Sequence, residues 1–127
     1  MFDREVFRRD ECFQIQGAVF DVYREMGCGF LEAAYQECLA KELSKRHIPF
    51  VAHRELKLTY KGQSLQQSYI LDFVCYESIV VELKVLASIT KQHKAQMLNY
   101  LKVSGMHVGL LANFGSHPKA TVERILL

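Results

Sequence analysis

Two acidic residues and a lysine stand in the part of the sequence that should form the buried middle of a sheet. Asp72 precedes Glu82 by ten positions, and Lys84 follows two residues after Glu82. All three interrupt apolar runs that are typical of buried strands. Burying such groups costs free energy unless each finds a partner of opposite charge. A divalent cation and a phosphate would supply these partners, so the trio predicts phosphodiester chemistry.

Strand alternation predicts which way these side chains point. Glu82 and Lys84 are two residues apart and therefore share a face. The other face of both strands carries an apolar set that is expected to pack against helices: Leu71, Phe73, Cys75, Val81, Leu83 and Val85. Asp72 then belongs with Glu82 and Lys84. This requires a connection with an odd number of residues between the two strands, such as residues 76–78. A two-residue turn would put Asp72 and Glu82 on opposite faces.

The predicted proximity of two carboxylates indicates a metal site. Carboxylates a few ångströms apart repel each other, and one pKa rises unless a cation neutralises them. Ligands that are all oxygen select Mg²⁺ or Mn²⁺, so Asp72 and Glu82 are candidate ligands. Lys84 could stabilise charge on the reacting phosphate or orient the attacking water. The alternative is a Glu–Lys pair on an exposed sheet face, which the hydrophobicity of both strands disfavours.

A third acid, Glu32, lies one helical turn before Tyr35. It could reach the same metal, or a water held on it, from the helix side. A partly exposed glutamate beside a core tyrosine is the alternative interpretation.

A later helix carries a polar stripe that includes His93, Gln96 and Tyr100. Gln96 could contact a base or a phosphate, and Tyr100 could stack or donate a hydrogen bond. Lys94 lies on the same helix and adds a positive charge. A helix edge packed against the loop after the sheet explains the stripe as well, so both interpretations stay open.

The bulk composition describes one small globular domain, residues 1–127, with half of its residues hydrophobic. The net charge of +2 is too small to indicate a partner, but its distribution is uneven. From residue 84 onward there are six Lys or Arg and a single acid, Glu123. This half could attract an anionic ligand, although a solvated basic surface is the alternative.

The cysteines and the lack of long apolar runs indicate a cytoplasmic protein. The four cysteines show no C-x-x-C spacing, and Cys12, Cys38 and Cys75 fall on apolar stripes, as reduced thiols do. The charged start, residues 1–5, leads into no apolar segment of a signal peptide. No run approaches the roughly 18 apolar residues of a membrane helix.

Apolar periodicity predicts the elements that position these side chains. Helices are expected at residues 5–26, from Gly29 to about residue 46, and from residue 88 or 90 to 104. Strands are expected at residues 56–60, 65–76, 79–85, 108–112 and 122–127, the last with a helical turn as alternative. The predicted fold is an α/β sandwich in the order α-α-β-β-β-α-β-β.

Several of these residues together resemble a known family. The pattern consists of Gly29-x-x-Glu32-x-x-Tyr35, Asp72, Glu82-x-Lys84, Gln96-x-x-x-Tyr100 and the segment 109–115, which ends in Asn-Phe-Gly. It resembles the GxxExxY family, which is similar to the RecB-like branch of the PD-(D/E)xK nuclease superfamily, over about residues 11–126. One departure is Leu71, which stands where the superfamily name has proline.

The resemblance implies a restriction-endonuclease-like core, a mixed β-sheet flanked by helices. It implies a nuclease in which Asp72 and Glu82 bind Mg²⁺, Lys84 is catalytic, Glu32 is an accessory acid, and Gln96 and Tyr100 line the nucleic-acid path. We therefore expect hydrolysis of nucleic acid, DNA more than RNA, by a metal-activated water. The alternative is a non-catalytic module that keeps the fold and binds nucleic acid or a partner. Cutting both strands would require a homodimer or repeated nicking.

Overall fold

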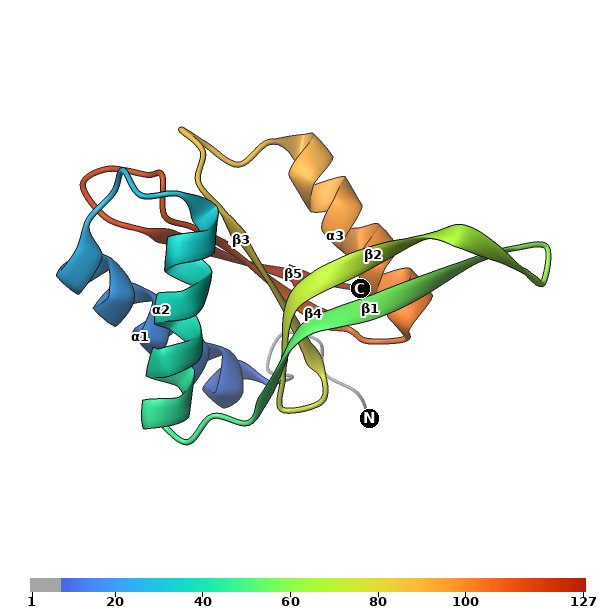
Figure 1. Ribbon diagram of the computed structural model, residues 1–127, viewed down its shortest axis with the longest axis horizontal. Helices are drawn as coiled ribbons and strands as arrows, with labels where there is room; N and C mark the ends of the chain where they lie inside the picture. The colour runs from blue at the N-terminus through green and yellow to red at the C-terminus, as the bar shows by residue number, and fades with distance from the viewer. Residues whose placement is uncertain (1–7) are drawn as a thin grey trace.

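The computed structural model describes residues 8–127, and the predicted order of elements is confirmed (Figure 1). Residues 1–7, which include the charged start and the predicted beginning of the first helix, lie outside the described residues. The elements are α1 (Arg9–Met26), α2 (Glu32–Lys45), β1 (Phe50–Tyr60), β2 (Gln63–Cys75), β3 (Ile79–Lys84), α3 (Lys91–Ser104), β4 (Val108–Asn113) and β5 (Thr121–Leu126).

The five strands form one mixed sheet in the order β1-β2-β3-β4-β5. The central pair, β3 and β4, is parallel, and the other three pairs are antiparallel. Helix α3 connects the two parallel strands, as a crossover helix must. Figure 1 shows α1 and α2 on one side of the sheet and α3 on the other, so the chain has the predicted α/β fold with a helix-flanked mixed sheet.

Both faces of β3 are buried, which explains its nearly continuous apolar sequence. Val81 and Leu83 pack into the larger core beneath α1 and α2, whereas Val80 packs into a smaller core with Met97 and Leu101 of α3. A strand covered on both faces has no solvent side that tolerates charge. Glu82, only 6% exposed in this strand, therefore needs a local partner.

The prediction that Leu71 shares a face with Phe73 is wrong. Phe73 belongs to the larger core, but Leu71 packs in the smaller core on the α3 side. The β1–β2 hairpin turns over between these residues, and the break coincides with a positive φ of 56° at His53, which lies across from Asp72 in the register. Asp72 thus sits at a point of irregular twist, which a strict two-residue period does not capture.

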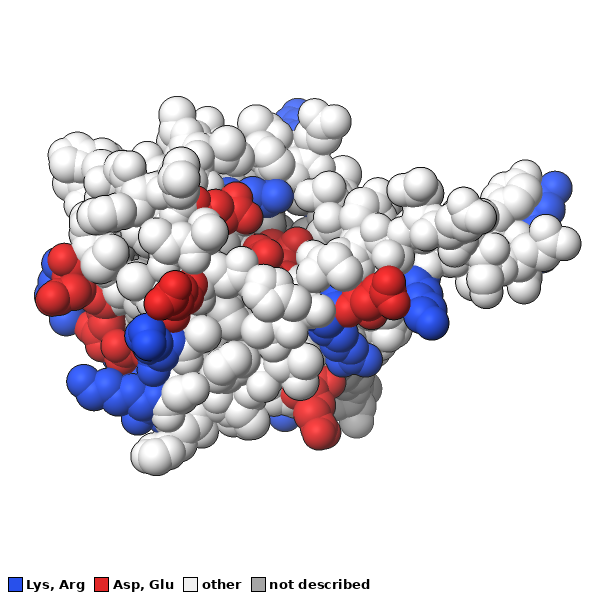
Figure 2. Space-filling model, viewed as in Figure 1, with Lys and Arg blue, Asp and Glu red and all other residues white. Residues whose placement is uncertain are grey.

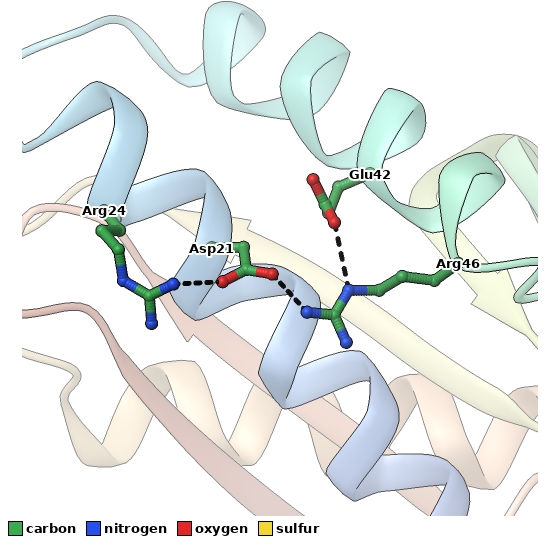
Figure 3. Close-up of polar contacts among 4 residues, drawn as sticks. All are labelled: Asp21, Arg24, Glu42 and Arg46. Atoms are coloured by element: carbon green, nitrogen blue, oxygen red, sulfur yellow. Dashed lines mark hydrogen bonds and ion pairs between the residues drawn. The ribbon is translucent and has the colours of Figure 1, made fainter.

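An ion-pair network joins α1 to the end of α2 (Figure 3). The Arg46 guanidinium donates to Asp21 of α1 and to Oε2 of Glu42 at 3.1 Å, and Arg24 donates to Asp21 at 2.7 Å. Gly17 leaves room for this guanidinium, since a Cβ at that position would lie 2.9 Å from Arg46 Nη1. The network fixes the C-terminal end of α2 against α1, and α2 carries Glu32 at its opposite end.

The cysteines match their predicted state as free thiols. Cys12 and Cys75 are buried, and burial raises the pKa of Cys12 to about 11 and that of Cys75 to about 12. Among residues 8–127, no helix is both long and apolar enough to cross a membrane.

Candidate active site

Asp72 and Glu82 meet where β2 and β3 separate. The strand pairing ends at Phe73 opposite Val81, and three residues, 76–78, connect the strands, so the predicted connection and register are confirmed. Beyond this pair, side chains replace the backbone ladder. The Asp72 N–H donates to Glu82 Oε2 at 2.6 Å, and the Leu83 N–H donates to Asp72 Oδ2 at 2.8 Å. These two bonds explain why the strands can part without leaving buried N–H groups unpaired.

Its surroundings strongly perturb the carboxyl group of Glu82. Burial, followed by the negative charge of Asp72, raises the pKa of Glu82 to about 8, although Lys84 acts in the opposite direction. The hydrogen bond that Glu82 accepts from the Asp72 N–H favours the ionised form and offsets part of this rise. With a pKa of about 8, Glu82 keeps its proton at neutral pH beside the Asp72 carboxylate.

This donor set fits a hard divalent cation. Both acids offer only oxygen, both lie at the same point of the sheet, and one is buried with a raised pKa that a cation in place of the proton would relieve. Mg²⁺ needs only one or two carboxylates because waters complete its shell. Within residues 8–127, no group of three or more His, Cys, Asp or Glu is close enough to hold an ion. The structure thus assembles a two-carboxylate site, and Glu32 as a third ligand stays a prediction.

Lys84 reaches the same site from the end of β3. Its charge lowers the pKa values of both Glu82 and Glu32, so it lies within electrostatic reach of the two acids. In the described part of the chain its ammonium forms no ion pair with a carboxylate, and it borders a hollow beside α3. Lys84 can therefore bind an anion that enters this hollow.

Glu32 approaches the pair from the first turn of α2. Partial burial and the charge of Asp72 raise the pKa of Glu32, while Lys84 lowers it. Tyr35 holds the loop before it, because its hydroxyl donates to the Gly27 carbonyl at 2.5 Å and accepts from the Phe30 N–H at 3.3 Å. Glu32 thus lies within electrostatic reach of Asp72 and Lys84, and Tyr35 holds the loop that precedes it.

The segment Asn113–Gly115 fixes the end of β3, a role that the sequence analysis did not assign. Asn113 is fully buried. Its Oδ1 accepts from the N–H groups of Leu86 and Gly115, both at 3.0 Å, and its Nδ2 donates to the Leu86 carbonyl at 2.9 Å. A Cβ at Gly115 would lie 2.4 Å from Leu86 N, so only glycine fits. Asn113 therefore clamps the backbone just after Lys84.

Phe114 connects this clamp to the GxxExxY element. Its N–H donates to the Lys84 carbonyl at 2.8 Å, and its ring stacks on Tyr35 with centroids 4.5 Å apart. The strand that carries Lys84 and the loop that presents Glu32 consequently share one packed support.

We predict that Asn113→Ala lowers both stability and turnover. The change leaves half-buried backbone groups of residues 86 and 115 without their side-chain partner, which costs about 1–3 kcal/mol of unfolding free energy. It also releases the end of β3, so kcat should fall even under conditions in which the variant is folded. Urea unfolding and steady-state cleavage measure the two effects. Ile15→Ala is the control, because it empties a remote part of the core at a similar cost of about 2–5 kcal/mol. Equal kcat losses in both variants would contradict a positioning role.

The predicted nucleic-acid residues on α3 are only partly brought together. A hollow of about 570 Å³ adjoins Lys84 and is lined by Tyr69, Lys84, Gln92, His93, Ala95, Gln96, Asn99 and Tyr100. Burial, followed by the charge of Glu82, raises the pKa of Tyr100 to about 12. Lys94 does not line this hollow, since it forms an ion pair with Glu123 of β5 at 3.2 Å.

Two further lining residues, Gln92 and Asn99, were missed by the sequence analysis. They lie four residues before and three residues after Gln96, which is the spacing of one helix face. Extending the polar stripe by that spacing would have found them. His93 has a second task, because its Nδ1 accepts from the Thr90 N–H at 3.0 Å and completes the N-terminal cap of α3.

Figure 2 shows the charged groups of this region together, with acidic atoms in a hollow between α2 and the β1–β2 hairpin and basic atoms beside them. The residues that gather here come from α2, β2, β3 and α3, four separate segments of the chain. Their arrangement, two coupled carboxyl groups with a lysine at the mouth of a hollow, can bind a cation and an anion side by side.

Comparisons with known proteins give the same fold. The sequence profile described as the PD-(D/E)XK nuclease superfamily matches residues 9–125. The crystal structure of SSO0001 is similar, with a TM-score of 0.55 and 17% sequence identity, over 88% of this chain and 65% of that chain. This chain therefore spans about two thirds of that protein, and the likeness concerns the fold alone. No curated protein matches the chain.

Proposed function

Because this chain belongs to the PD-(D/E)XK nuclease superfamily, we propose that it is a metal-dependent nuclease that hydrolyses phosphodiester bonds. Asp72 and Glu82 hold Mg²⁺ or Mn²⁺, Lys84 is catalytic, and Glu32 is an accessory acid. Within the superfamily we assign the chain to the GxxExxY family of the RecB-like branch.

The observation that carries this proposal is the coupled carboxyl pair at the point where β2 and β3 separate. A buried glutamate with a pKa of about 8 is costly to retain in a strand that is otherwise apolar. A role in structure alone would be served better by an apolar residue of similar size. Binding a cation gives a reason for keeping both acids and for placing Lys84 beside them.

Each residue has a defined part in the proposed hydrolysis. When bound, the divalent ion supplies Lewis-acid chemistry, lowering the pKa of a water and polarising a phosphate oxygen. Asp72 and Glu82 hold the ion through oxygens that the β2–β3 backbone bonds keep in place. The Lys84 ammonium binds a non-bridging phosphate oxygen and stabilises the charge that grows there. The water oxygen bonds to phosphorus and releases one proton to the surrounding water, while the bond to the sugar oxygen breaks and that leaving oxygen takes up a proton from the surrounding water.

The substrate is nucleic acid, and DNA is proposed ahead of RNA. Gln96 and Tyr100 border the hollow beside Lys84 and line the path of the strand, with His93 at the start of the helix. Lys94, which pairs with Glu123, would contact nucleic acid only outside this hollow. One chain provides one site, so cutting of both strands takes a homodimer or two successive nicks. Sedimentation of the active protein distinguishes these arrangements.

The proposal is tested by offering labelled single- and double-stranded DNA and RNA to the wild-type protein with Mg²⁺, Mn²⁺ or EDTA. We expect cleavage of DNA that needs the metal and stops with EDTA. Metal binding is measured in parallel by calorimetry with wild type and Asp72→Asn. Absence of both cleavage and metal binding would refute the enzyme assignment and leave the non-catalytic binding module.

A further inference from the structure

The outer part of the β1–β2 hairpin projects from the body of the protein (Figure 1). We call residues 57–69 the hairpin arm, because they lie between Leu56 of β1 and Leu71 of β2, the outermost residues of the two strands that pack into the smaller core. The turn at its tip is Lys61-Gly62, with φ values of 49° and 79°. Positive φ at both central residues is the geometry of tight hairpins whose twist matches that of their strands. The tip of the arm is therefore a tight hairpin turn, and the two strands of the arm pair with one register shift between Lys57 and Thr59.

The composition of the arm suits a polyanion. Residues 57–69 include Lys57 and Lys61 and no Asp or Glu, and the one acid at the base of the arm, Glu55, accepts a hydrogen bond from the Ser68 hydroxyl at 3.1 Å. Most of its other residues can donate hydrogen bonds: Thr59, Tyr60, Gln63, Ser64, Gln66, Gln67, Ser68 and Tyr69. These are the side-chain types that contact phosphates and base edges in nucleic acid. In Figure 2 the projecting part shows basic atoms at its tip and no acidic atoms.

The outer edge of the arm is poorly suited to pairing with a second copy of the chain. β1 is an edge strand of the sheet and carries Arg54, Glu55 and Lys57 in succession around Leu56. Its register with β2 shifts between Lys57 and Thr59. Charged side chains and bulges on an edge strand are features that prevent strand addition. A nucleic acid is therefore a better occupant than another copy.

The arm is continuous with the candidate active site. Tyr69 at its base contacts the Tyr100 ring edge-on, with centroids 5.0 Å apart. The same tyrosine lines the hollow beside Lys84. A strand whose phosphate lies at Lys84 would thus pass Tyr69 and meet the arm.

We propose that the hairpin arm inserts into the major groove of double-stranded DNA when the backbone lies at the Lys84 hollow. The proposal rests on the nuclease function proposed above. The six arm residues 63–68 of β2 extend about 20 Å, and the B-DNA major groove, about 12 Å wide, admits a two-stranded β-ribbon. The major groove of A-form RNA is too narrow for side chains to read, so duplex DNA is the substrate class. Lys57 and Lys61 contact phosphates on the walls of the groove.

The test is the salt dependence of DNA binding by the variant Lys57→Gln/Lys61→Gln. Binding of a labelled 24-base-pair DNA and of its single strand is followed by fluorescence anisotropy in EDTA, so that no cleavage intervenes. The matched control is Lys41→Gln/Lys45→Gln, which removes the same charge from exposed positions on α2. We expect the arm variant to bind the duplex about tenfold more weakly and its slope of log K against log salt to fall by about 2. Control and single-strand binding should change little.

Cleavage of bis(p-nitrophenyl) phosphate separates this proposal from the nuclease assignment, because so small a diester cannot touch the arm. Equal hydrolysis of this diester by wild type and arm variant, together with weaker duplex binding by the variant, supports both the nuclease assignment and the arm proposal. Loss of duplex affinity without any diester hydrolysis supports the arm and counts against the nuclease. The arm proposal is overturned if the arm variant keeps the wild-type slope of log K against log salt for the duplex. It is also overturned if the variant loses equal affinity for the duplex and the single strand. A third result would also overturn it: the variant sediments as a monomer where the wild type is a dimer, and its DNA affinity is unchanged. That result would assign the arm to contact with a second copy of the chain.

Discussion

Lys84→Ala should reduce cleavage by roughly 10²-fold or more while leaving the fold and metal affinity intact. The ammonium lies within electrostatic reach of Glu82 and Glu32 and makes no ion pair with a carboxylate among the described residues. Removing the ammonium therefore breaks no ion pair among the described residues. The expected loss of cleavage rate comes from the missing stabilisation of charge in the transition state. The single-turnover cleavage rate with saturating Mg²⁺ measures this loss.

Lys102→Ala is the matched control for this experiment. Lys102 is exposed near the end of α3 and does not line the hollow, so the same charge is lost at a remote site. Its cleavage rate should stay close to that of wild type. Calorimetric titration with Mn²⁺ should show unchanged affinity in both variants. Retention of cleavage by Lys84→Ala would exclude the catalytic role assigned to this lysine.

Glu82→Gln should stabilise the metal-free protein at pH 8 and have little effect at pH 5. The pKa of Glu82 is about 8 in the folded protein, against about 4.3 for an unperturbed glutamate. Between these two values the folded state keeps a proton that the unfolded chain has released. Stability therefore falls as pH rises through this range, by up to about 1.4 kcal/mol per pH unit. Glutamine carries no such proton, so this contribution disappears.

The substitution preserves the local hydrogen bonds, which makes the comparison clean. The amide oxygen of glutamine can accept the Asp72 N–H as the glutamate does, and its NH₂ group adds a neutral donor beside the Asp72 carboxylate. Urea unfolding in EDTA at pH 5, 6.5 and 8 gives the two stability curves. Added Mg²⁺ should raise the melting temperature of wild type at pH 8 more than that of the variant. Parallel curves for the two proteins would show that Glu82 is not the group with the raised pKa.

Much of the fold was predictable because its signals are local. The change from a helical to a two-residue apolar period near residue 50 separates the helices from the strands, and Gly27 and Gly105 end α1 and α3 as expected. The odd connection at residues 76–78 follows from requiring Asp72 and Glu82 to share a side of the sheet. The sequence predicted their register because a shift of one residue would turn one acid into an apolar core.

The wrong face predicted for Leu71 and the ion pair of Lys94 have a different origin. Leu71 packs with the opposite core because the hairpin backbone is irregular near His53, where φ is positive, and no two-residue apolar period reveals such a position. Lys94 pairs with Glu123 because β5 lies beside β4, a neighbourhood that no local pattern encodes.

The sequence by itself determined the order of elements and the identity of the two acids and the lysine, because residue type and short periodicities act along the chain. Only the tertiary structure decided how these residues are supported. Asn113 and Phe114 lie far along the chain from Tyr35 and Lys84, yet the parallel pairing of β3 with β4 places Asn113 opposite Lys84 and the Phe114 ring on Tyr35. Contacts of this kind join distant segments, and their energies depend on packing that exists only once the sheet has formed.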